Sequence, residues 1–137
     1  MTREDLQRLA DVRLSEAGAL FEAGYPEGAY YLAGYAAECA IKACIAKQTD
    51  LHEFPDLDRA KESWSHDLAR LIKAAGFQDE LVAAVIQDTR FDANWKIVRN
   101  WRPESRYRLV SQNEAAELLK ALREPAKGVM EWLKLHW

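Results

Sequence analysis

The stretch at residues 28–47, GAYYLAGYAAECAIKACIAK, decides the fold of this chain. Small or apolar side chains occupy nearly every position, and a helix with such a sequence is buried on most sides by other elements. Two charged residues, Glu38 and Lys42, interrupt the stretch and make it too polar for a membrane span. The sequence therefore predicts a central helix that the rest of the chain covers.

Glu38 and Lys42 are the unusual residues of this helix. They are four positions apart with the acid first, which is the better orientation for a helical ion pair. Charges inside a buried helix are costly unless partners satisfy them. The pair either fixes the packing of the helices or lies at a cleft where it binds or orients a ligand.

Length and composition are those of one globular domain over residues 1–137. The chain is 49% hydrophobic and 30% charged, with a formal net charge of -3, which argues against nonspecific binding of duplex nucleic acid by the whole surface. The first residues contain no apolar signal core, and no run has transmembrane length, so we expect a cytoplasmic protein without a membrane segment. Cys39 and Cys44 project about 140° apart on a helix with roughly 100° per residue, so we expect free thiols.

The first half of the chain predicts two long helices and a short one. Residues 2–22 form a helix with Thr2 as N-cap, and the following Gly24 folds the central helix back into an antiparallel hairpin. Residues 48–65 have no regular pattern and should be irregular, with three apolar side chains tethering them to the core. Ser65 then caps a short helix over residues 66–75. The three tethers are Phe54, Leu57 and Trp64.

The second half predicts two further helices. One begins at Asp79, weakens around residues 91–94, resumes as a short turn and ends at Pro103. The last begins at the capping box of residues 111–114 and continues to the C-terminus as one helix, kinked at Pro125. No segment alternates as a strand does. The expected class is all-α, an up-down bundle of four principal helices plus a short helix.

His66 is the first candidate for chemistry. A histidine at a helix start usually supports the cap or packs against an aromatic neighbour such as Trp64, but it can also act as an acid–base group near neutral pH. His52 and His136 have no metal-ligand spacing with it. We therefore expect no metal site and no cofactor.

Residues 95–108, WKIVRNWRPESRYR, form a basic island in an acidic protein. Positive charge next to aromatic rings suits single-stranded nucleic acid, which is bound through phosphate pairing and base stacking. The alternative is structural: the two tryptophans lie in the core, and the arginines pair with acids such as Glu16, Glu22 or Glu38. The cations are Lys96, Arg99, Arg102, Arg106 and Arg108, and the aromatic residues are Trp95, Trp101 and Tyr107.

Three motifs in this order, YYLAGYAAECAIKA, SHDLARLI and NWRPESRY, resemble the HEPN domain family over about residues 14–132. The resemblance implies a four- to five-helix bundle that dimerises, with a cleft near the dimer axis. It also implies a possible partner, because many prokaryotic members accompany a minimal nucleotidyltransferase as toxin–antitoxin pairs.

Active HEPN toxins carry an arginine and a histidine separated by four to six residues, which together form a metal-independent ribonuclease site. Arg102 matches the arginine, but no histidine follows it, and Arg106 and Tyr107 stand there instead. In related pairs a tyrosine near this motif receives a nucleotide from the partner enzyme, and Tyr107 is the matching position. The resemblance extends site roles to Glu38, Lys42, His66, Arg102, Arg106 and Tyr107.

Three hypotheses follow. The first is a homodimeric module that binds RNA, a nucleotide or a nucleotidyltransferase partner. The second is a divergent ribonuclease in which His66 replaces the absent histidine. The third is a structural dimer scaffold without a ligand.

Overall fold

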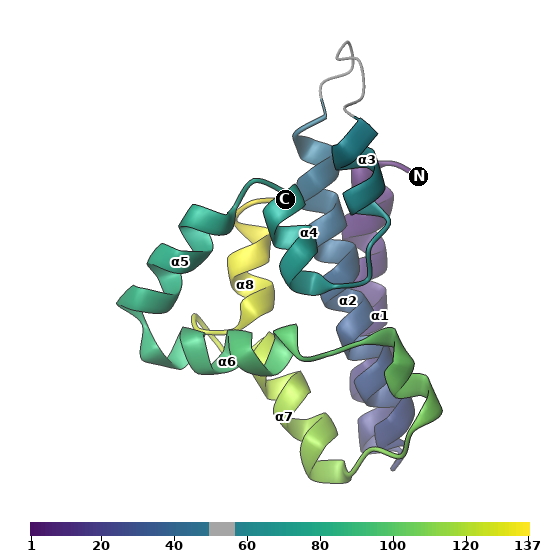
Figure 1. Cartoon of the computed structure of the whole chain (residues 1–137). Helices are drawn as coiled ribbons and strands as arrows, with labels where there is room; N and C mark the ends of the chain where they lie inside the picture. Colours follow the sequence, from purple (N-terminus) through teal and green to yellow (C-terminus); the bar gives the residue numbers. More distant parts are fainter. Residues whose placement is uncertain (50–56) are drawn as a thin grey trace.

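The computed structural model describes residues 1–49 and 57–137 (Figure 1). All regular structure in these residues is helical, which confirms the all-α class. The described chain nevertheless divides into eight α-helices and one 3₁₀ helix, more and shorter pieces than the sequence predicts.

The first two helices form the predicted antiparallel hairpin. α1 (Arg3–Glu22) begins at a capping box in which the Thr2 hydroxyl accepts from the Asp5 amide and the Asp5 carboxylate accepts from the Thr2 amide. Gly24 follows the helix at φ 86°, a left-handed conformation that suits glycine. α2 (Pro26–Lys47) then returns along α1 (Figure 1).

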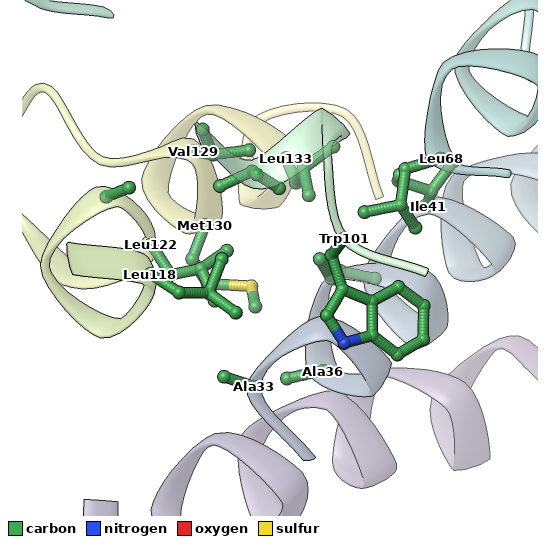
Figure 2. Close-up of a cluster of buried hydrophobic side chains, with 14 of the residues drawn as sticks. Ala33, Ala36, Ile41, Leu68, Trp101, Leu118, Leu122, Val129, Met130 and Leu133 are labelled. Carbon is green, nitrogen blue, oxygen red and sulfur yellow. The ribbon is translucent and has the colours of Figure 1, made fainter. Parts of the chain in front are cut away.

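Helix α2 is the centre of the molecule. Twelve of its 22 residues are buried, and α1, α4, α7, α8 and the 3₁₀ helix η1 pack against it. Figure 2 shows Ala33, Ala36 and Ile41 of this helix facing side chains from the other elements. Both cysteines are free thiols, as predicted. The prediction of a covered central helix is confirmed.

The segment after α2 differs from the sequence prediction. Residues 57–63, predicted as irregular, form α3 (Leu57–Ser63), and the next helix is α4 (Leu68–Ala74) with Asp67 rather than Ser65 as N-cap. Two of the three predicted core tethers are wrong, because Leu57 and Trp64 are exposed. The third, Phe54, lies outside the described residues.

The helix predicted from Asp79 is divided at Asp88. α5 (Gln78–Gln87) ends there, and α6 (Thr89–Arg99) begins with the Asp88 carboxylate accepting hydrogen bonds from the first-turn amides. The predicted weakening over residues 91–94 is wrong, because these residues are helical and two of them, Phe91 and Asn94, are buried. η1 (Pro103–Tyr107) follows α6 after the fully buried Trp101.

The last predicted helix is two helices. α7 (Gln112–Arg123) begins at Ser111, whose hydroxyl accepts from the Glu114 amide, but the Glu114 carboxylate bonds Arg108 instead of closing the predicted capping box. α8 (Val129–Lys134) follows a turn in which Ala126 has φ 63°. The single kinked helix was therefore a wrong prediction.

Contacts with α6 hold the turn between α7 and α8. The buried Asn94 amide donates to the Glu124 carboxylate at 2.7 Å and to the Lys127 carbonyl at 3.0 Å. Arg90 also pairs with Glu124, and Lys127 pairs with Asp88. The two chain breaks that the sequence analysis missed are thus bonded to each other.

Candidate functional site

A buried carboxylate lies at the centre of the candidate site. Glu38 on α2 is only 3% exposed. Lys42 Nζ lies 2.8 Å from Glu38 Oε1, and His66 Nδ1 lies 3.0 Å from the same oxygen and 3.1 Å from Oε2. The predicted ion pair is confirmed, and the turn before α4 supplies the second partner that a buried carboxylate needs.

Glu38 also orients the imidazole of His66. A carboxylate only accepts hydrogen bonds, so Nδ1 is the nitrogen that carries the proton, and Nε2 of the neutral ring is left as an acceptor. The side chain is 51% exposed, and the ring that it contacts edge-on is Tyr35, at 6.3 Å between centroids. His66 is therefore held as an acid–base group would be, and α4 is capped by its neighbour Asp67.

Arg102 joins the segment before η1 to the turn that carries His66. One guanidinium nitrogen lies 3.2 Å from Asp67 Oδ2, and the other donates to the carbonyls of Arg99 and Trp101 at 2.8 and 2.9 Å. The guanidinium is thus positioned beside the residue that follows His66. Two segments that are far apart in the sequence meet at this ion pair.

Arg106 and three tyrosines extend the site along α2 and η1. The Arg106 guanidinium lies 4.8 Å from the centroid of the Tyr107 ring, and hydrogen bonds with Tyr107 and Tyr31 raise its pKa, so the side chain stays cationic. Hydrogen bonds with Tyr35 and Arg106 lower the pKa of Tyr31. Burial and the hydrogen bond with Tyr31 raise the pKa of Tyr35 to about 12.

Sequence reasoning missed Tyr31 and Tyr35. A signal for them was present, because they precede Glu38 and Lys42 at positions that share one face of a helix, at spacings of four, three and four residues. Their rings pack edge to face at 5.0 Å, and Tyr35 contacts Trp101 at 5.2 Å.

The remaining members of the basic island are divided between core and surface. Trp95 and Trp101 are buried, so the structural alternative holds for both tryptophans. The acids suggested as partners of the arginines, Glu22 and Glu38 among them, are not their partners: Arg102 pairs with Asp67 and Arg108 with Glu114. Within the described part of the chain, no carboxylate pairs with Arg99 or Arg106.

Two further findings concern residues 1–49 and 57–137 alone. No group of three or more histidine, cysteine, aspartate or glutamate side chains in them is arranged to hold a metal ion. None of their helices is long and apolar enough to span a bilayer.

The model of the HEPN domain family matches residues 3–136, nearly the whole chain and every helix described above. The chain belongs to the HEPN domain family. This membership confirms the resemblance seen in the sequence and indicates a module related to nucleotides or RNA. Searches among curated proteins and among solved structures gave no match.

In this HEPN domain, no histidine follows Arg102 at the spacing of the ribonuclease motif. Tyr107 lies four residues beyond Pro103, at the end of η1, and is 78% exposed. A histidine does lie near Arg102, but it comes from the turn before α4, next to the Asp67 carboxylate that pairs with the arginine. The fold, rather than sequence spacing, thus brings Arg102 to the turn that carries His66.

Proposed function

We propose that this HEPN domain binds the phosphate groups of RNA or of a nucleotide. The binding surface, called the Arg102 surface below, consists of Arg99, Arg102, Arg106, Tyr107 and His66, with Glu38 and Lys42 beneath His66. The observation that carries the proposal is the ion pair between Arg102 and Asp67, because it joins the basic segment to the turn that bears His66.

The charges on this surface favour a phosphate ligand. Arg99 and Arg106 have no carboxylate partner in the described residues. Arg102 pairs with one carboxylate there, with 3.2 Å between its guanidinium nitrogen and Asp67 Oδ2. Guanidinium groups bind phosphate through paired, charge-assisted hydrogen bonds, and an arginine without an acidic partner loses no ion pair on binding. The phenol of Tyr31 beside Arg106 adds a hydrogen-bond donor to the same surface.

A double variant tests the proposal. We expect Arg102→Ala with Arg106→Ala to weaken binding of a short single-stranded RNA, measured by fluorescence anisotropy at several salt concentrations. Loss of two phosphate contacts should reduce the slope of log K against log salt by about 1.4, since each contact to a single strand contributes about 0.7.

The matched control is Arg90→Ala. Arg90 resembles Arg102 in its exposure, 46% against 47%, and in pairing with one carboxylate. It lies in the first turn of α6, whereas Arg102 follows the last turn of this helix. This variant should bind RNA as the unmodified chain does. Unchanged affinity and salt slope in the double variant would contradict the proposal.

A second candidate function is metal-independent cleavage of RNA, and the contact between Glu38 and His66 favours it. Nε2 of His66 would take the proton of a ribose 2′-hydroxyl, whose oxygen attacks the adjacent phosphorus. The bond from phosphorus to the 5′-oxygen breaks, that oxygen takes a proton from water, and His66 returns its proton to water, so the products are a 2′,3′-cyclic phosphate and a 5′-hydroxyl. Arg102 would stabilise the charge that develops on the phosphate.

The cleavage candidate predicts activity that persists in chelator and depends on His66. We expect His66→Ala to reduce the cleavage rate by about 10²- to 10⁴-fold, the usual contribution of a general acid–base group. RNA affinity, measured on the same variant, should change far less than the rate. Absence of cleavage by the folded, RNA-binding protein would reject this candidate and leave the binding function in place.

Homodimerisation, a nucleotidyltransferase partner and a toxin–antitoxin role are parts of the same proposal. They rest on the family resemblance, as does nucleotide transfer to Tyr107, whose exposed phenol is compatible with it. Light scattering of the purified protein measures its molar mass and tests the dimer directly.

A further inference from the structure

Trp64 is the most exposed aromatic residue in the described part of the chain. It is 83% exposed in the turn between α3 and α4, although the sequence predicts it in the core. Tryptophan is highly buried on average, and its large flat ring in water is suited to stacking on a partner. This exposure therefore needs an explanation that the bundle itself does not provide.

The position of Trp64 links it to the Arg102 surface. It precedes His66 by two residues and Asp67, the partner of Arg102, by three. Three residues of chain span at most about 11 Å, so the backbone of Trp64 lies beside this surface. In Figure 1 the connection from α3 descends along α2 to the start of α4, on the side where η1 also lies.

Tyr107 is the second exposed ring at the same surface. It follows Arg102 by five residues, about 10 Å at the rise of about 2.0 Å per residue of a 3₁₀ helix. Arg106 already stacks on its ring. Two exposed aromatic residues from different segments thus lie within a few residues of the ion pair between Arg102 and Asp67.

Two other tryptophans are buried, which leaves fewer rings for stacking. Trp95 and Trp101, which the sequence places among the stacking candidates, are enclosed in the core and cannot contact a base. Trp64 and Tyr107, which are exposed, are the rings that remain available for stacking near Arg102 and Arg106. Single-stranded nucleic acid is bound by such combinations of positive charge and aromatic rings, whereas the bases of a duplex are already stacked on one another.

We propose that Trp64 and Tyr107 are base-stacking residues of the Arg102 surface, on which the bases on either side of a bound RNA phosphate stack. This inference rests on the phosphate-binding function proposed above. It adds a binding residue, Trp64, that the phosphate-binding proposal does not contain.

The test compares two probes, an eight-nucleotide single-stranded RNA and inorganic tripolyphosphate, which has phosphates but no bases. We expect Trp64→Ala to weaken binding of the RNA by about 10-fold or more and to leave tripolyphosphate binding unchanged. Trp64→Phe, which retains a stacking ring, should restore most of the RNA affinity. Ile86→Ala is the matched control, because it removes another exposed apolar side chain, on α5.

The outcomes separate this inference from the proposed function. If Trp64→Ala leaves RNA affinity unchanged while the Arg102/Arg106 double variant lowers it, the stacking role is wrong and the phosphate site stands. If Trp64→Ala weakens tripolyphosphate binding as much as RNA binding, the inference is also overturned. If the unmodified protein binds neither probe, both proposals fail.

Discussion

Gly34→Ala is expected to remove a large part of the folding free energy. A Cβ atom at this position of α2 would lie 2.0–2.1 Å from three atoms of the Trp101 indole. Trp101 is fully buried against α2 (Figure 2), so the ring cannot move aside without disturbing the core. Overpacking of a core typically costs about 1–3 kcal/mol and occasionally more.

The cost of Gly34→Ala should lie at or above the upper end of that range. Alanine favours a helix over glycine by up to about 1 kcal/mol, which offsets only part of the clash. Against a total stability of about 5–15 kcal/mol, a net loss of about 3 kcal/mol shifts the urea midpoint clearly. Circular dichroism during urea unfolding measures it.

The same helix provides a matched control in Gly28→Ala. The Cβ atom there would meet Leu20 Cδ1 at 3.1 Å, and that flexible side chain can turn away. This variant should be as stable as the unmodified protein or slightly more stable. Adding Trp101→Phe to Gly34→Ala should recover part of the loss, because phenylalanine lacks part of the indole that meets the added Cβ atom. The replacement breaks no hydrogen bond, since the indole Nε1 has no partner in the described structure. A fully stable Gly34→Ala protein would contradict the packing of Trp101 on α2.

Gly128→Ala is expected to have a comparable effect at the turn between α7 and α8. A Cβ atom would lie 2.6 Å from the Leu122 carbonyl oxygen and 2.7 Å from that of Glu124. These are backbone atoms, so the turn itself would have to open. The α8 side chains Val129 and Leu133 are buried and would leave the core with it. We expect a loss of about 3 kcal/mol or failure to fold.

Thermal unfolding of Gly128→Ala and Ala126→Gly tests this prediction within one turn. Ala126 has φ 63°, a left-handed conformation that costs an L-residue about 1–2 kcal/mol and that glycine adopts freely. Glycine there loses more backbone entropy on folding, so Ala126→Gly should change stability by less than about 1 kcal/mol. Equal melting temperatures for Gly128→Ala and the unmodified protein would show that the turn is not as described.

Local patterns in the sequence predicted the hairpin of α1 and α2 correctly. Thr2 with Asp5 and the glycine at position 24 are signals that act within a few residues, and both are present in the structure. The pair of Glu38 and Lys42 was equally predictable, because residues four apart on a helix are neighbours whatever surrounds them.

The breaks at Asp88 and at residues 124–128 were not predictable in the same way. The apolar positions stay in register across Pro125, so local patterning favours one continuous helix. The stabilisation that ends it comes from Asn94, which bonds the turn at Glu124 and Lys127, 30 and 33 residues away. Long-range hydrogen bonds of this kind leave no periodic trace in a sequence.

The candidate site shows the same division. By itself the sequence determined the all-α class, the buried central helix, the Glu38–Lys42 pair and the cations that precede α7, because each depends on residue type and on spacing along one segment. Only the tertiary structure decided that His66 bonds Glu38, that Arg102 meets Asp67, that Trp101 is core and that Trp64 is exposed. The physical reason is that burial and pairing between segments depend on how the helices pack. The same local sequence can place a side chain in water or in the core.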